Sequence, residues 1–263
     1  MEIRELMNTS KPMPTVATLD AALTAICEAQ PFVVRYKVRD LRTGQEWTRG
    51  DREVTPSAST RKTSIMMAAL HAAGKGQIDL QERVTYEARH AIEVASGIFR
   101  HLTPGIVITL EDAVRGMMVL SDNVCTKMVF ERLELDAVDA YCKSIGMGNT
   151  HHRFLIPPLA LKPDHALDDV TVTTAADQVM LLQAILDGQT SEEAASKLHC
   201  SVEHCRFALR TLRGQVLRYG IHSRLPFDTQ IASKSGRGRR GRMDTGIVYR
   251  DGSPRFIIAV FAG

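Results

Sequence analysis

The sequence predicts an α/β (α+β) fold in which both ends of the chain build one antiparallel sheet and a mostly helical region packs around it. Strand-like patterns lie near the two ends of the 263-residue chain, and helical patterns fill the middle. No internal repeat, low-complexity tract or long linker interrupts the chain. We therefore expect a single unit over residues 1–263, with the sheet in about 15–55 and 225–263 and the helices in about 56–224.

The predicted strands show period-two alternation or lie beside tight turns. In VRYKVRD at 34–40, apolar residues alternate with basic ones, which is typical of a half-buried strand. TQIASKSG at 229–236 predicts a further strand. GIVYR, followed by Asp251-Gly252 and RFIIAVFAG, predicts a hairpin closed by a tight turn.

Two stretches in the middle of the chain carry helix-start signals. TLEDAVRGMMVL begins with Thr109 and Asp112 at the spacing of a capping box, with Asp in place of the usual Glu. TAADQVMLLQAILDG begins at Thr174 and ends at Gly188, which predicts a helix with a cap at each end. Helices therefore dominate between the two groups of strands.

The composition indicates a globular protein with a sizeable core. Hydrophobic residues make up 44% and charged residues 24% of the chain, which argues against wholesale disorder. A net charge of +3 is mildly basic and gives no argument for nucleic acid by itself. No apolar stretch approaches the length that crosses a bilayer.

The N-terminal segment and the cysteines predict a cytoplasmic location for the sequence as it stands. MEIRELMNTSKPMPTVATLD carries acidic residues and lacks the apolar run of a secretory signal. Five cysteines, an odd number without a signal, are typical of reduced cytosolic thiols. A leader removed from the sequence would instead imply a periplasmic or secreted protein.

The stretch SASTRKTSIMMAAL at 57–70 places a lysine one helical turn after a serine, where a buried helix begins. Because positions i and i+3 share a helix face, the amine of Lys62 can lie beside the hydroxyl of Ser59. A serine hydroxyl needs a base to become a nucleophile, and a lysine serves when burial and nearby positive charge lower its pKa. Taken alone, the pattern also fits a helix cap followed by a solvated lysine.

Two further triplets follow in order along the chain. SDN at Ser121–Asn123 precedes a second helix, and KSG at Lys234–Gly236 lies on the predicted strand. Together with Ser-x-x-Lys they match the signature of serine β-lactamases and penicillin-binding proteins, except that Ser235 replaces a threonine and keeps the hydroxyl. The chain thus resembles the class A serine β-lactamase family. HLTPGIVITLEDAVRGMMVLSDN, RLPFDTQIASKSG and TVTTAAD extend the resemblance over nearly the whole chain, which implies a β-lactamase/transpeptidase-like fold.

The resemblance implies a catalytic role for three residues. Ser59 would attack an acyl carbon, Lys62 would take its proton, and Ser121 would relay a proton to the leaving nitrogen. Ser121 also has a purely structural interpretation, as the N-cap of the following helix.

The resemblance also implies a substrate-binding role for five residues. Asn123 would bind a substrate amide and Lys62, and Gly236 would let the backbone approach closely. Lys234 and Ser235 would hold a carboxylate. The N–H groups of Ser59 and Arg237 would form an oxyanion hole. In the structural alternative, Asn123 is only a first-turn residue and Lys234 a solvated strand residue.

The glutamate that activates the hydrolytic water in class A enzymes is missing. It belongs to a loop between the second and third motifs, which corresponds to HHRFLIPPLALKPDHALDD at 151–169. Counting back from TVTTAAD puts the expected position near Pro157 or Pro158. The sequence leaves open whether an ionisable loop residue replaces the glutamate as base, although such loop residues are more often surface residues. The candidates are His151, His152, Asp164, His165, Asp168 and Asp169. We assign no deacylating base and expect slow deacylation.

Arginines lie beside two of the motifs. Arg61 would lower the pKa of Lys62 if its side chain lay close, or would point into solvent. KSGRGRRGR adds four arginines next to the proposed carboxylate-binding strand: Arg237, Arg239, Arg240 and Arg242. They fit a substrate with one or two acidic groups, a nucleic-acid or lipid patch, or a solvated turn. No aromatic residue interleaves them, which weakens the nucleic-acid interpretation.

We expect no cofactor and no metal. The pairs His199-Cys200 and His204-Cys205 repeat at an offset of five residues, which does not align on one helical face. Tetrahedral zinc sites also prefer a shorter cysteine spacing, so we interpret the repeat as structural.

Three functional hypotheses follow. The first is a serine hydrolase of β-lactamase type that forms a covalent acyl-enzyme with a β-lactam or related amide, which would imply β-lactam catabolism and antibiotic resistance. The second is a cytosolic amidase, esterase or acyltransferase that uses the same residues on another anionic substrate. The third is a β-lactam-binding protein that is acylated without turnover. The expected partner is a small molecule with a carboxylate, not nucleic acid or a membrane, and the sequence indicates no oligomeric state.

Overall fold

The computed structural model describes residues 16–263, with side chains from residue 18 onward. In this part of the chain no helix combines the length and the apolar character needed to span a bilayer. Most of the N-terminal segment on which the expected location rests lies outside the described residues.

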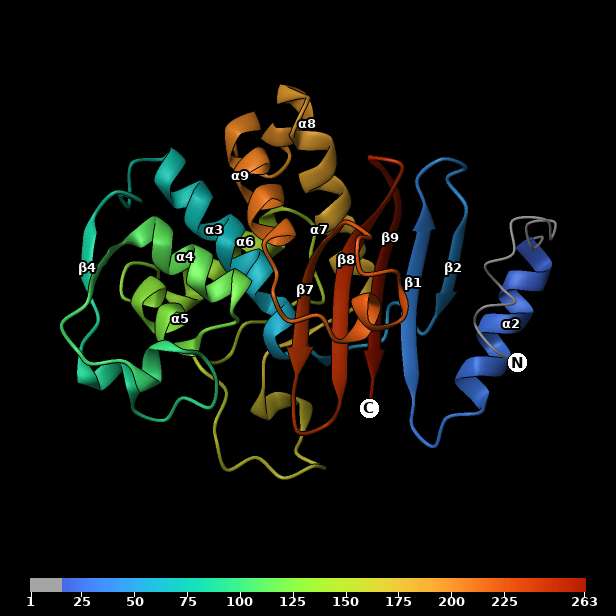
Figure 1. Cartoon of the computed structure of the whole chain (residues 1–263), viewed down its shortest axis with the longest axis horizontal. Helices are drawn as coiled ribbons and strands as arrows, with labels where there is room; N and C mark the ends of the chain where they lie inside the picture. The colour runs from blue at the N-terminus through green and yellow to red at the C-terminus, as the bar shows by residue number, and fades with distance from the viewer. Residues whose placement is uncertain (1–15) are drawn as a thin grey trace.

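A five-stranded antiparallel sheet combines strands from both ends of the chain in the order β2-β1-β9-β8-β7 (Figure 1). Its strands are β1 (Val34–Asp40), β2 (Glu46–Arg49), β7 (Ile231–Arg237), β8 (Arg242–Arg250) and β9 (Ser253–Ala262). Two small sheets pair β3 (Thr55–Pro56) with β6 (Val172–Thr173), and β4 (Arg83–Thr85) with β5 (Val107–Thr109). The predicted fold class is confirmed.

Helices occupy most of the chain between the two groups of strands. The α-helices are α2 (Val16–Glu28), α3 (Lys62–Gly74), α4 (Leu110–Val119), α5 (Asn123–Phe130), α6 (Leu135–Ser144), α7 (Ala175–Gly188), α8 (Glu192–Ser196) and α9 (Val202–Arg213). Short 3-10 turns are η1 (Ala58–Arg61), η2 (Ala88–Ala91), η3 (Phe99–His101), η4 (Leu167–Asp169) and η5 (Gly220–Arg224). The sequence analysis placed residues of about 15–55 in the sheet part, whereas α2 at the start of this range is a helix that packs against the sheet.

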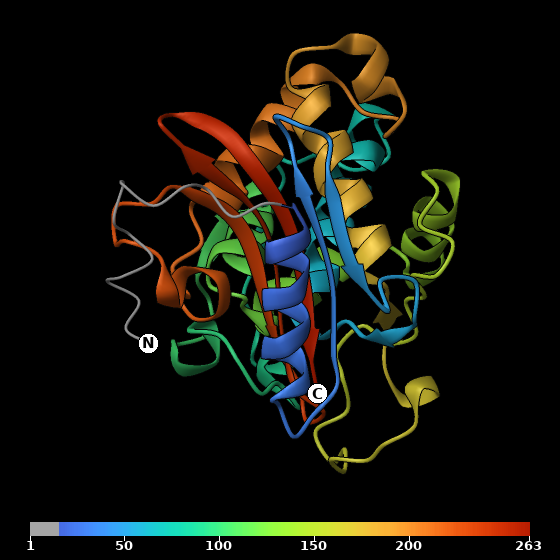
Figure 2. The same cartoon turned by 90° about the vertical axis from the view of Figure 1, so that its right-hand side faces the viewer.

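The two faces of the sheet have different coverings. On one face α7 and α9 pack against the strands, and the main core includes Met243, Ile247 and Phe261. On the other face α2 lies across the sheet from α7 (Figure 2) and contributes to a small cluster with Trp47 and Val260. Because side chains alternate along a strand, successive residues of β7, β8 and β9 point to opposite faces of the sheet.

Local predictions at the strand ends and helix starts are confirmed. The strand predicted at 34–40 is β1. The turn between β8 and β9 has positive φ at Asp251 (52°) and Gly252 (75°), as a two-residue hairpin turn requires. Thr109 Oγ1 accepts a hydrogen bond from the N–H of Asp112 at the start of α4 (3.0 Å), and Thr174 caps α7 in the same way.

The predicted cap at the end of α7 is wrong. Gly188 is still helical, and Gln189 follows as the C-cap. A Cβ on Gly188 would lie 2.5 Å from Cys205 Sγ. The glycine therefore allows α9 to pack closely on α7, and it does not end the helix by its conformation.

Candidate active site

The turn that carries Ser59 is held in place by a distant segment. Both N–H and Oγ of Ser57 donate to the carbonyl of Thr171, at 3.0 and 2.9 Å. Ala58 has a φ of 43°, a left-handed conformation that alanine rarely adopts. Ser59 follows in η1 as a half-buried residue, and its Oγ has no hydrogen-bond partner among the residues that the structure describes. The hydroxyl is therefore free where α3 begins.

Lys62 is the first residue of α3, and oxygens of the SDN triplet enclose its amine. Nζ lies 2.8 Å from the carbonyl oxygen of Ser121, 3.3 Å from Ser121 Oγ and 2.7 Å from Asn123 Oδ1. The residue is 1% exposed. Burial lowers the pKa of Lys62 well below its ordinary value, and the positive charges of Lys234 and Arg61 lower it further. Within the described part of the chain, no hydrogen bond joins this amine to Ser59.

Asp122, and not Ser121, is the N-cap of α5. Asp122 Oδ1 accepts the N–H groups of Val124 (2.8 Å) and Cys125 (3.2 Å). Ser121 has a φ of 56° and directs both its carbonyl and its hydroxyl to Lys62. The structural interpretation of Ser121 as a cap is therefore wrong. Asn123 begins α5, as its structural alternative required, yet its side chain also contacts Lys62.

Lys234 and Gly236 lie on the face of β7 that packs against the Ser59 turn. A Cβ on Gly236 would come within 3.1 Å of the Ser59 nitrogen and 3.2 Å of the Ser57 carbonyl oxygen, so a larger residue would push the strand and the turn apart. Lys234 is fully buried, and its Nζ donates to the carbonyl of Ser235 (2.9 Å). Burial lowers the pKa of Lys234 to about 7. The alternative of a solvated Lys234 is therefore wrong.

Ser235 and Arg237 alternate to the opposite face of β7. Ser235 is 1% exposed, and its Oγ has no partner among the described residues. Arg237 is exposed at the end of the strand. Since β7 is an edge strand of the sheet, alternate backbone N–H groups point away from β8.

Arg61 ties the loop that follows the second motif to the Ser59 turn. It is 1% exposed, and its guanidinium donates to the carbonyls of Phe154 and Leu155 and to Thr171 Oγ1 (3.1 Å). Burial lowers the pKa of Arg61 to about 10, so it stays charged at neutral pH. The alternative that Arg61 points into solvent is wrong. The loop is therefore bonded to this turn through the backbone carbonyls of Phe154 and Leu155, and not through the nearby prolines.

In the described structure, none of the six ionisable side chains of the loop forms a hydrogen bond or ion pair with a motif residue, and those that are bonded have other partners. His152 Nε2 lies 3.0 Å from Ser64 Oγ, and burial together with the charge of Arg61 lowers the pKa of His152 to about 3. Asp168 forms an ion pair with Arg153 across the base of the loop (3.0 Å).

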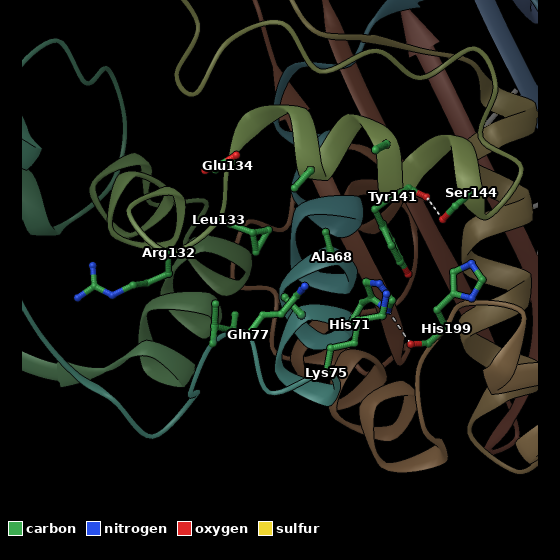
Figure 3. A pocket seen from close by; sticks show the side chains of 14 residues that line it. Ala68, His71, Lys75, Gln77, Arg132, Leu133, Glu134, Tyr141, Ser144 and His199 are labelled. Carbon is green, nitrogen blue, oxygen red and sulfur yellow. Dashed lines mark hydrogen bonds between the residues drawn. The ribbon is translucent and has the colours of Figure 1, made fainter.

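A cavity of about 720 Å³ lies along the C-terminal half of α3, against α6, and no motif residue lines it (Figure 3). His71 and Tyr141 line it, with their ring centroids 5.3 Å apart. His71 Nδ1 is 2.9 Å from the carbonyl oxygen of His199. The duplicated His-Cys segment borders it through His199. Across residues 16–263, no group of three or more His, Cys, Asp or Glu side chains is placed to hold a metal ion.

Asp244 is a buried residue beside the motifs that the sequence analysis missed. It lies on β8 directly opposite Ser235 of β7, and it is 2% exposed. The available signal was a single acidic residue within MDTGIVY, an otherwise mostly apolar strand sequence.

The fold and the three motifs correspond to those of a serine β-lactamase or penicillin-binding protein. The model of the Beta-lactamase enzyme family matches residues 18–263, and the chain belongs to that family. The predicted resemblance is thereby confirmed.

Individual relatives share about a quarter of the sequence. Beta-lactamase CARB-4 of Pseudomonas aeruginosa is 26% identical over 228 residues, which cover 85% of this chain and 74% of that protein. The β-lactamase of Sphaerobacter thermophilus DSM 20745 superimposes with a TM-score of 0.79 at 25% identity, covering 92% of this chain and 87% of that one. PBP-A superimposes with a TM-score of 0.78 at 23% identity, covering 96% and 89%.

Proposed function

We propose that this protein is a serine hydrolase that opens a β-lactam or related amide through a covalent acyl-enzyme on Ser59, and that it hydrolyses this acyl-enzyme slowly. The observation that carries the proposal is the enclosed amine of Lys62, whose pKa is lowered, one turn after the free hydroxyl of Ser59. Membership of the β-lactamase family supports the class of hydrolase.

Acylation requires groups that lie close together. Neutral Lys62 takes the proton of Ser59 as Oγ bonds to the carbonyl carbon of the substrate. The amine then passes a proton to Ser121 Oγ, 3.3 Å away, and Ser121 delivers its own proton to the leaving nitrogen as the C–N bond breaks. The N–H groups of Ser59 and Arg237 stabilise the oxyanion.

Substrate recognition rests on the third motif and on Asn123. Protonated Lys234 attracts a substrate carboxylate, which also receives the hydroxyl of Ser235. The Ser235 hydroxyl supports this role because it is buried without a partner. Asn123 binds the substrate amide and keeps Lys62 oriented through Oδ1.

Deacylation requires a base for the attacking water, and the loop offers no carboxylate in contact with the motif residues. A leucine-to-glutamate variant of PBP-A has been solved as an acyl-enzyme complex with penicillin G. That complex, on a variant that carries the introduced glutamate, supports the idea that a protein of this fold is acylated by penicillins. Loss of a general base slows its step by about 10²–10⁴-fold.

Mass spectrometry after incubation with a penicillin tests the proposal. We expect an adduct of the penicillin's mass on the wild-type protein and none on Ser59→Ala. An adduct that decays supports a slow hydrolase, and one that persists supports a binding protein without turnover. Equal labelling of Ser59→Ala contradicts the proposal.

Stopped-flow kinetics with a chromogenic cephalosporin measures the two steps separately. We expect a burst equal to the enzyme present, followed by a slow steady rate. Fast linear turnover without a burst, at a kcat of about 10–10³ s⁻¹, contradicts slow deacylation and would direct attention to His151 and His152.

A second candidate is an amidase, esterase or acyltransferase with a non-β-lactam anionic substrate. The exposed arginines between β7 and β8 favour an acidic substrate of this kind. No penicillin adduct, together with labelling of Ser59 by a general serine-directed acylating probe, would support this candidate.

A further inference from the structure

The chain that leads into η3 forms a hydrogen bond with each residue of the SDN triplet. Ser96 Oγ donates to the carbonyl of Ser121 (3.3 Å), and the carbonyl of Ser96 accepts the N–H of Asn123 (3.1 Å). The N–H of Phe99 donates to Oδ2 of Asp122 (2.9 Å). Ser96 takes part in two of these bonds, and its hydroxyl is the side chain of this stretch that reaches the triplet.

The contact between the two stretches depends on unusual backbone conformations. Gly97 has a φ of 112°, and a Cβ there would lie 2.3 Å from Cγ of Asp122, so only glycine lets the chain pass this carboxylate. Ser121 has a φ of 56°, which a serine keeps only when the surrounding contacts hold it there. The bond from Ser96 to the Ser121 carbonyl is one of those contacts.

The carbonyl oxygen of Ser121 is shared between two donors. It accepts Nζ of the buried Lys62 at 2.8 Å and Oγ of the exposed Ser96 at 3.3 Å. A carbonyl oxygen has two lone pairs, so these donors occupy both. Because a hydrogen bond to the charged form of a group favours that form, an oxygen that also accepts from Ser96 stabilises the ammonium form of Lys62 less than an oxygen reserved for it.

The other charged and titratable groups around Lys62 do not depend on the Ser96 hydroxyl. Lys234 of β7 and Arg61 of η1 lower the pKa of Lys62 in addition to burial, whereas Asp122 and Cys125 beside α5 raise it. A substitution that removes only the hydroxyl of Ser96 leaves all four groups in place. Its effect on Lys62 therefore passes through the Ser121 carbonyl.

We propose that Ser96 is a positioning residue, which holds Ser121 in place and, by sharing the Ser121 carbonyl with Lys62, favours the neutral amine that takes the proton of Ser59. The inference rests on the proposed function, because it concerns the base of the acylation step. Ser96 acts through Ser121, and its own hydrogen bonds in the described structure go to backbone groups. A merely structural role would hold the triplet without changing the protonation of Lys62.

An NMR titration of Lys62 tests the proposal without any acyl chemistry. The Ser59→Ala protein is labelled with ¹³C at the lysine Cε atoms, and the Lys62 resonance is identified by its loss in Lys62→Met. We expect Ser96→Ala to raise the titration midpoint of Lys62 by about 0.3–1 pH unit, because the Ser121 carbonyl then serves the ammonium group alone. Ser96→Thr keeps the hydroxyl and should restore the original midpoint. An unchanged midpoint in Ser96→Ala overturns the proposal.

The pH profile of penicillin acylation distinguishes positioning from a structural role. In Ser96→Ala the rate should fall about 2–10-fold below the Lys62 midpoint, which corresponds to that shift, and should equal the wild-type rate well above it. A loss of the same size at every pH overturns the proposal. Ser196→Ala is the matched control, since Ser196 is an exposed serine whose Oγ also donates to a backbone carbonyl, that of Glu193 (2.7 Å). It should change neither the midpoint nor the rate.

Thermal melting checks that each variant folds. If Ser96→Ala does not fold, Ser96→Cys decides in both experiments, because a thiol is a weaker donor than a hydroxyl. Failure of the wild-type protein to form a penicillin adduct would contradict the proposed function. A raised Lys62 midpoint in Ser96→Ala would even then support the assignment of Ser96, so the two failures are distinguishable.

Discussion

The two sides of Ser59 differ in the chemistry of their buried charged groups. On the side of α5, the amine of Lys62 contacts three oxygens of Ser121 and Asn123 and has a lowered pKa. On the side of the loop, the guanidinium of Arg61 binds backbone carbonyls and a threonine hydroxyl.

This difference separates proton transfer from loop anchoring. Lysine can release and take a proton when its pKa is lowered, whereas arginine only donates hydrogen bonds and stays charged at neutral pH. The α5 side is therefore suited to proton transfer during acylation. The loop side is suited to holding backbone in place, and Arg61 cannot activate a water as a base.

The largest expected effect comes from removing the base on the α5 side. Lys62→Met should lower the acylation rate by about 10²–10⁴-fold, measured by rapid quench and mass spectrometry. In the wild type, acylation needs neutral Lys62, so the rate should fall as pH falls through its lowered pKa and stay level above it. A wild-type rate that rises only near the ordinary lysine pKa of about 10.4 would contradict the assignment of Lys62 as base.

A smaller effect is expected from the other buried lysine. Lys234→Ala should weaken transition-state binding of substrates with a carboxylate by about 2–4 kcal/mol, and neutral ester analogues should be less affected. Because protonated Lys234 binds the carboxylate and its pKa is about 7, kcat/KM for acidic substrates should fall as pH rises through that region. Equal losses for acidic and neutral substrates would indicate a structural or proton-transfer role instead.

A carboxylate added on the loop side should give that side a group that can take a proton, as Lys62 does on the α5 side. Leu155→Glu places an acid on a residue whose carbonyl binds Arg61, and we expect the acyl-enzyme to decay about 10–10²-fold faster, within the range of a general base. Leu159→Glu is the matched control, since both leucines are 45% exposed in the same loop. The decay of the adduct mass measures the effect, and identical decay in both variants would show that position 155 does not reach the attacking water.

The smallest effect is expected from loosening the loop itself. Arg61→Met removes the donors for the carbonyls of Phe154 and Leu155, which should destabilise the protein by about 1–3 kcal/mol and speed amide exchange in the loop. Arg52→Met, at an exposed position, serves as the control. Hydrogen exchange followed by mass spectrometry measures the change; unaltered exchange in residues 153–171 would exclude the anchoring role.

Sequence motifs located the candidate site, but they left the state of its side chains open. The order of Ser59, Ser121 and Lys234 along the chain was enough to bring three distant segments into one hypothesis. The same motifs could not show which face each side chain takes. From the sequence, Lys234 could be either a solvated strand residue or a residue of the site. The structure shows that it is buried where β7 packs against η1.

Arg61 and Asp244 show why side-chain environments escaped the sequence. The direction of Arg61 depends on free carbonyls more than 90 positions away, at Phe154 and Leu155. The burial of Asp244 depends on a loop at Gly220 that packs over β8. Neither partner can be identified from the neighbouring sequence.

The sequence by itself determined the fold class, the paired strands at both chain ends, the helix starts at Thr109 and Thr174, and the three motifs. These features depend on alternation, capping and turn chemistry over a few consecutive residues. Only the tertiary structure decided that Asp122 caps α5, that Gly188 packs against α9, and that Lys62 and Lys234 are buried. Desolvation and hydrogen-bond pairing depend on which distant groups share an enclosed space, and that is set when the segments pack together.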